Sequence, residues 1–104
     1  MPANLTEEEF SKHVNTKFRF KPDADTEIEL ELNQVKPYSS RHLEHEGMER
    51  FSVFFVGPEQ PLLQQMTYPV NHEQMGEFEL FLVPVARIEG GFRYEAVFNY
   101  FRQA

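Results

Sequence analysis

The sequence contains no cysteine and no tryptophan, and it has no long uninterrupted hydrophobic run. Without cysteine, the chain cannot form a disulfide framework, a thiolate metal site or a cysteine nucleophile. No apolar segment approaches the roughly 18 residues of a membrane-spanning helix, and the N-terminus lacks the hydrophobic region of a signal peptide. We therefore expect a cytoplasmic protein that does not enter the membrane.

Basic residues are also scarce. The 104 residues include 10 Lys and Arg against 17 Asp and Glu, which leaves a formal net charge of -7. This balance argues against a phosphate backbone, and hence against nucleic acid, as the partner. A chain of this length supports one hydrophobic core, so we expect a single domain over residues 1–104.

Aromatic residues, in contrast, are abundant: the chain has 11 Phe and 4 Tyr. Many of them alternate with polar residues or lie beside branched aliphatic residues, which is typical of strands. The composition therefore favours a β-rich fold whose core consists largely of rings.

The N-terminal region carries the signals of a short helix. Thr6 and Glu9 have the spacing of a capping box, and Leu5 with Phe10 has that of a hydrophobic staple. Three glutamates follow Thr6, at the helix end where negative charge is favourable. These signals predict a helix over residues 7–14 with Phe10 and Val14 on its buried face.

The next segment predicts a β-hairpin. Residues 16–21 alternate phenylalanine with basic residues, residues 26–35 begin by alternating aliphatic with acidic residues, and Pro22-Asp23-Ala24-Asp25 between them favours a turn. Folded back antiparallel, the strands place unlike charges opposite each other and apolar residues opposite each other. The predicted pairs are Lys21 with Glu27, Phe20 with Ile28, Arg19 with Glu29, Phe18 with Leu30 and Lys17 with Glu31.

The rest of the chain predicts four more strands. They cover residues 51–56, 65–70, 78–88 and 92–101, and a polar loop occupies residues 36–50. Gly90-Gly91 joins the last two strands, because glycine accepts the backbone angles of a tight turn. The fold class is therefore mainly β: about six antiparallel strands form a small barrel or a two-sheet sandwich, and the N-terminal helix plugs one end or edge.

We find no catalytic signature and expect neither enzymatic activity nor a cofactor. His42 and His45 are candidate metal ligands, but a solvated polar loop explains them without a metal, and the spacing of catalytic zinc helices is absent. Glu95 lies in an apolar strand and could act as an acid if it were buried, but such a glutamate more often points outwards or pairs with a cation such as Arg87 or Arg93.

The last two strands suggest an interaction surface. If they pair without a bulge, they have two apolar faces, of which the core covers only one. The second face would be covered by the N-terminal helix or by another protein, and a bulge at Pro84 would shift the facing. The candidate residues of this second face are Phe78, Leu80, Leu82, Val97 and Phe101.

Several segments resemble a bacterial family of domains of unknown function, number sixty-nine sixteen. They are residues 51–58, 63–70, 76–85 and 94–99, and the resemblance extends to the helix around Phe10 and the strand at residues 30–35. It implies a small β-rich domain without an assigned activity or site residues. It also implies a loose association with phage-tail-like proteins.

Together these patterns predict a non-catalytic protein-interaction or assembly module whose partner is another protein or a second copy. The alternative is a small barrel that binds an apolar or aromatic ligand in an open mouth, because such pockets are lined by rings. A core filled by its own phenylalanines would argue against this alternative.

Overall fold

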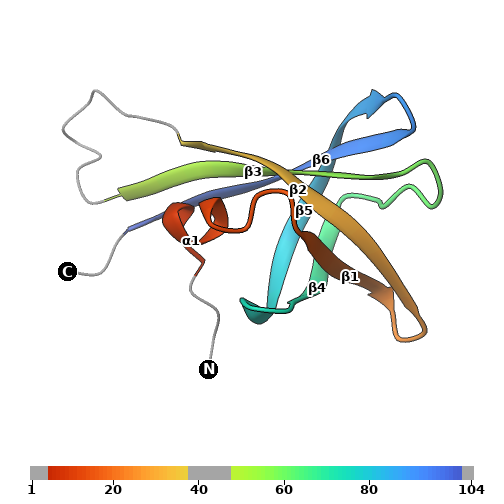
Figure 1. Cartoon of the computed structure of the whole chain (residues 1–104), viewed down its shortest axis with the longest axis horizontal. Coiled ribbons are helices and arrows are strands. Elements are labelled where there is room, and N and C mark those ends of the chain that lie inside the picture. The colour runs from red at the N-terminus through yellow and green to blue at the C-terminus, as the bar shows by residue number, and fades with distance from the viewer. Residues whose placement is uncertain (1–4, 38–47, 102–104) are drawn as a thin grey trace.

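Six antiparallel strands close into a barrel, with one short helix beside it, in the computed structural model of the chain (Figure 1). The structure describes residues 5–37 and 48–101, and for residues 48, 49 and 99–101 it describes the strand but not the side chains. The elements are α1 (Glu7–Ser11), β1 (Lys17–Asp23), β2 (Thr26–Pro37), β3 (Met48–Pro58), β4 (Met66–His72), β5 (Gly76–Ile88) and β6 (Gly91–Phe101). Around the barrel the strand order is β1-β2-β3-β6-β5-β4, and β4 pairs with β1 to close the ring. The predicted fold class is confirmed, and the barrel is the form that it takes.

The β1–β2 hairpin has the predicted register. Arg19 lies opposite Glu29 and Phe18 opposite Leu30, and the pairs on either side of them also agree. The ladder shifts between Phe20 and Asp23, so the predicted pair of Lys21 with Glu27 is not among the register pairs. The basic and acidic residues face each other on the outside, where Lys17 Nζ lies 3.6 Å from Glu31 Oε1.

The strands on either side of the predicted 36–50 loop are longer than the sequence indicated. β2 continues to Pro37 and β3 begins at Met48, so residues 36–37 and 48–50 belong to strands. The remainder of the predicted loop, including His42 and His45, lies outside the described residues. The longer strands arise because β2 and β3 pair with each other as far as Pro37 and Phe51, and β3 pairs with β6 as far as Met48.

A β-bulge divides the last hairpin. Ile88 pairs with Gly91, so the turn residues are Glu89 and Gly90, and Gly90 has a positive φ of 81°. The register then shifts between Pro84 and Ala86. Because side chains alternate along a strand, one extra residue reverses the facing of everything beyond it. The prediction that assumed pairing without a bulge, and with it the predicted second apolar face, is therefore wrong.

Gly91 is not a turn residue. It is the first residue of β6, where the backbones of β6 and β3 approach closely. A Cβ atom at this position would collide with the carbonyl oxygen of Gly57 in β3. The residue type is therefore required by packing between strands and not by the turn.

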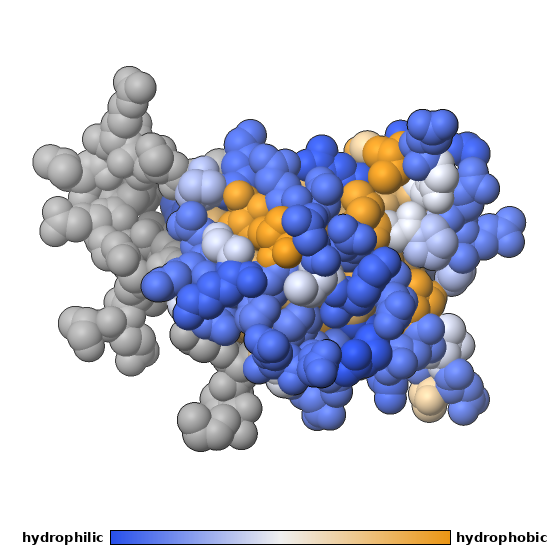
Figure 2. Space-filling model, viewed as in Figure 1, coloured by the Kyte–Doolittle hydropathy of each residue, from blue (hydrophilic) through white to orange (hydrophobic). Residues whose placement is uncertain are grey.

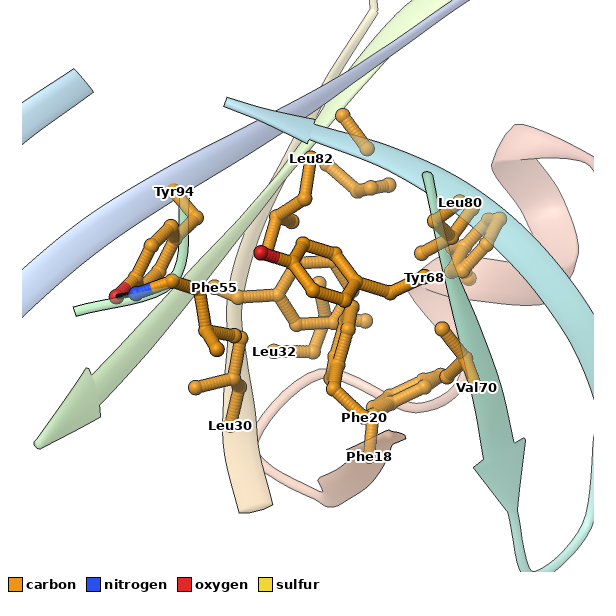
Figure 3. Packing of buried hydrophobic residues seen from close by; sticks show 14 of the residues in the cluster. Phe18, Phe20, Leu30, Leu32, Phe55, Tyr68, Val70, Leu80, Leu82 and Tyr94 are labelled. Atoms are coloured by element: carbon orange, nitrogen blue, oxygen red, sulfur yellow. Dashed lines mark hydrogen bonds between the residues drawn. The ribbon is translucent and has the colours of Figure 1, made fainter. Parts of the chain in front are cut away.

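The barrel interior is filled by side chains, most of them aromatic or branched (Figure 3). Phe18 and Phe20 from β1 each meet Phe55 of β3 edge-on, with ring centroids 5.3 and 5.2 Å apart. Tyr68 of β4 and Tyr94 of β6 also point inward, and both are almost fully buried. Such edge-to-face contacts add to the stabilisation that burial provides.

Helix α1 closes one end of this interior. Thr6 Oγ1 accepts a hydrogen bond from the Glu9 N–H at 3.1 Å, as the capping spacing predicted. The fully buried Phe10 ring lies between 5.4 and 6.2 Å from the rings of Phe18, Phe51, Phe78 and Phe98. The helix ends at Ser11 and not at residue 14, because the chain then turns to enter β1.

Candidate functional site

The residues predicted to form one interaction surface do not share a face. Leu80 and Leu82 of β5 point into the core and are 2% and 0% exposed, and the partly buried Phe78 packs against the core. Val97 of β6 points outward and is 62% exposed. The side chain of Phe101 lies outside the described part of the chain. The physical reason is the bulge between Pro84 and Ala86, which reverses β5 relative to β6.

The same bulge creates a different apolar surface on the outside of the barrel. Val83 pairs with Glu95. Phe81, two residues before Val83, and Val97, two residues after Glu95, therefore point to the same outer side. Phe81 is 51% exposed, and Val85 at the bulge is also exposed. We call Phe81, Val85 and Val97 the outer β5–β6 face.

Polar contacts border this face on the side of β3. Glu95 lies between the buried Tyr94 and Ala96, so strand alternation turns its side chain to the outer side, where it accepts a hydrogen bond of 2.6 Å from Oγ of the buried Ser52. The Arg93 guanidinium lies 4.2 Å from the centre of the Phe54 ring and donates a hydrogen bond of 2.8 Å to Gln34 Oε1. A stacked arginine beside exposed apolar side chains resembles the composition of protein interfaces.

A second group of polar side chains lies inside the molecule, between α1 and the end of β4. His72 is 4% exposed and His13 is 7% exposed, and their ring centroids are 4.6 Å apart. Nε2 of His13 lies 3.4 Å from Glu9 Oε2, and Nε2 of His72 lies 3.0 Å from Thr16 Oγ1. We call Glu9, His13, Thr16 and His72 the histidine cluster.

The hydrogen bonds of this cluster define which nitrogen of His72 carries the proton. Nδ1 of His72 accepts from the N–H groups of Gln74 and Met75, both at 3.1 Å, so this nitrogen is unprotonated. Nε2 must then carry the proton and donate it to Thr16 Oγ1. The Thr16 hydroxyl in turn donates to the carbonyl oxygen of His13 at 2.6 Å.

This arrangement does not activate Thr16 as a nucleophile. A general base must accept the hydroxyl proton, but Nε2 of His72 donates to that oxygen. Burial, together with the neighbouring His13 and Arg19, lowers the pKa of His72, and the Glu73 carboxylate opposes this shift only in part. The cluster therefore holds a neutral imidazole that is satisfied on both nitrogens.

Shallow grooves on the surface are lined by charged residues. One, of about 420 Å³, lies where β1 meets β4 and includes Lys21, Glu27, Glu77 and Glu79 in its lining. Another, of about 430 Å³, lies near the β5–β6 turn and is also lined by charged residues. Figure 2 shows that, on one side of the molecule, hydrophobic side chains reach the surface in several places, each bordered by hydrophilic ones.

The predicted metal ligands His42 and His45 lie outside the described residues, so the metal prediction stays untested at that loop. Among residues 5–37 and 48–101, no three His, Asp or Glu side chains are grouped so that they could hold a metal ion. The interior positions that an apolar ligand would occupy are filled by phenylalanine rings, including Phe18, Phe20, Phe51 and Phe55. Across the same residues, no helix has the length and apolar character needed to span a membrane.

The histidine cluster was not predicted, although the sequence contains one signal for it. His72 follows Tyr68 and Val70 at intervals of two residues, so strand alternation alone places its side chain on the inward face. Its partner His13 is 59 positions away in the chain, and no local pattern connects the two.

A comparison with family models finds a match over residues 5–98 to a domain of unknown function, DUF6916. The searches of curated proteins and of solved structures found no match.

Proposed function

We propose that this chain, which belongs to the DUF6916 family, is a non-catalytic module that binds another protein. The family description assigns no activity, so the proposal is argued from the surface of the barrel. The binding surface in this proposal is the outer β5–β6 face. The partner is a component of a multi-protein structure, for which a phage-tail-like assembly is the setting that the family resemblance implies.

The observation that carries this proposal is the exposure of Phe81 beside Val97. Phe81 is half exposed and lies next to the exposed Val97, so the two form an apolar patch. Burying such a patch against a partner protein is favourable. The helix does not cover it, since Phe10 of α1 packs against the inward side chains of β5 and β6. Aromatic anchors of this kind contribute much of the binding energy in protein interfaces.

Site-specific photo-crosslinking tests the proposal. A photoreactive phenylalanine analogue replaces Phe81, and the protein is irradiated in extracts of the cells that make it, with adducts identified by mass spectrometry. We expect one dominant protein adduct, which is lost when Val97 is also changed to Asp. The identity of the adduct distinguishes a second copy of this chain from a different protein.

The matched control carries the same analogue at Glu29, an exposed position on the outer side of β2. Chance encounters would label both positions alike. The same set of adducts at positions 81 and 29, or no adduct at position 81, would refute binding through this face.

A further inference from the structure

The β4–β5 connection is held by the side chain of His72. Its Nδ1 accepts the N–H groups of Gln74 and Met75, both at 3.1 Å, and so satisfies two backbone donors of the turn. The Met75 side chain is 7% exposed and belongs to the core cluster, so the turn also fixes part of the barrel interior.

The other nitrogen of His72 holds the link between α1 and β1. It donates to Thr16, whose hydroxyl bonds to His13 O and whose carbonyl oxygen accepts the N–H of Leu32 in β2. Asn15 adds a second bond, from its N–H to Leu32 O at 2.7 Å. One imidazole ring therefore joins two connections that are more than 50 residues apart in the chain.

We propose that His72 is an acid-sensitive latch, which holds the β4–β5 turn and the α1–β1 link together when neutral and loosens both when protonated. A second proton must bind at Nδ1, where it would point at two N–H donors and remove their acceptor. The turn must then open, or the ring must leave its site. This proposal does not depend on the proposed function.

Burial and the charges around His72 make the protonated state unfavourable in the closed fold. His13 faces it from the segment after α1 and Arg19 from β1, while the Glu73 carboxylate of the turn acts in the opposite direction. Glu9 of α1 lies against His13 on the far side from His72, 3.4 Å from its Nε2. Two neighbouring imidazolium rings would repel each other at this separation.

The direction of the pH effect follows from linkage. His72 binds a proton less readily in the folded protein, so folding is favoured above the ordinary histidine pKa of about 6.5. The contribution is lost as the pH falls from about 6.5 towards the lower pKa of the folded state. An unperturbed carboxyl group titrates below this window, whereas an unperturbed imidazole titrates within it.

Amide hydrogen exchange at pH 7.5, 6.5 and 5.5 tests the latch, with protection factors corrected for the intrinsic exchange rate. Protection of the Gln74 and Met75 amides is expected to fall by up to about tenfold per pH unit below about 6.5. The amides of residues 15 and 16 should follow the same trend. The β3–β6 ladder should keep its protection throughout.

The matched variant is His72→Asn, whose side-chain oxygen can accept the same two N–H groups but does not titrate in this range. Its protection at Gln74 and Met75 should be independent of pH, while His13→Gln should reduce the pH effect without abolishing it. If the wild type and His72→Asn show equal pH dependence, the latch does not exist.

A second measurement keeps the proposal testable if His72→Asn does not fold. The imidazole signals of the wild-type protein are titrated by NMR, and the His72 midpoint is expected below 6.5. A midpoint at or above 6.5 would overturn the proposal, because protonation would then cost the closed fold nothing.

Discussion

Two tyrosine hydroxyls fix the segment that leads into β4. The buried Tyr94 hydroxyl accepts a hydrogen bond of 3.0 Å from the N–H of Leu63, and the Tyr68 hydroxyl donates one of 2.6 Å to the carbonyl of Gln64. Burial raises the pKa of both tyrosines, so neither hydroxyl ionises near neutral pH. A segment without regular structure is thus tied to the core at two neighbouring residues.

We predict that Tyr94→Phe destabilises the protein by about 1–3 kcal/mol, because the N–H of the buried Leu63 loses its partner. The measurement is the free energy of unfolding from urea denaturation at pH 7. Tyr68→Phe is the matched comparison, and its cost should be below about 1 kcal/mol, since water can reach the exposed Gln64. Equal losses in the two variants would show that water also replaces the Tyr94 hydroxyl.

At the level of the elements, α1 is a very short helix that depends on its packing. Five residues cannot form a stable helix alone, so tertiary contacts must hold it in place. Phe10 supplies most of these contacts, since it is the one buried residue of the helix. Phe10 therefore anchors the helix in the end of the barrel, beside the Thr6 cap and the flanking Leu5 and Val14.

Replacing this ring tests its role directly. Phe10→Ala is expected to lower the free energy of unfolding by about 3–5 kcal/mol, since it leaves a cavity among four other rings. The exposed Glu8 of the same helix is the control, and Glu8→Ala should change stability by less than about 0.5 kcal/mol. A small loss in Phe10→Ala would mean that the core closes without the helix.

The elements also show how far the sequence could predict this fold. The register of the β1–β2 hairpin was predictable from residue 17 to residue 20, because the alternating rings and opposite charges of Phe18, Arg19, Glu29 and Leu30 all agree on one pairing, but the shift beyond Phe20 was not. The sequence did not predict which way the β5 side chains face relative to those of β6. Their facing depends on a one-residue bulge near Pro84, which the local pattern permits but does not require.

The candidate site shows the same division. Exposed apolar residues on the last hairpin were expected. Because the bulge reverses the facing of β5, the exposed residue is Phe81, whereas Leu80 and Leu82 are buried. The histidine cluster could not be predicted as a unit, since the barrel closure that brings His72 beside His13 is a long-range event. Local alternation indicates an inward side chain, but it does not indicate what that side chain will meet.

In the barrel as a whole, the number of paired positions differs greatly from one pair of neighbouring strands to another. β3 and β6 pair along eleven successive positions, from Met48 with Phe101 to Pro58 with Gly91. β1 and β4 are joined at two positions, Arg19 with Asn71 and Phe20 with Val70. The Arg19 side chain reinforces this short seam with a hydrogen bond of 2.8 Å to Asn71.

We predict that the barrel opens first between β1 and β4. Under native conditions at pH 7, amides at this seam should exchange with solvent at least about tenfold faster than the central β3–β6 amides, because fewer bonds must break to expose them. Arg19→Met should increase the difference, and Lys17→Met is the control, since Lys17 lies outside the seam. Equal protection at both seams would mean that the barrel opens only by complete unfolding.

The position of β6 in the ring has a consequence for how the protein is made. β6 lies between β3 and β5 but follows both in the chain, so a ribosome releases β3 well before its neighbour exists. During that interval the nascent chain presents an apolar strand with a bare edge, which is a template for association with other chains. The barrel cannot close before β6 has been made, so the edge of β3 that β6 covers stays unpaired until then.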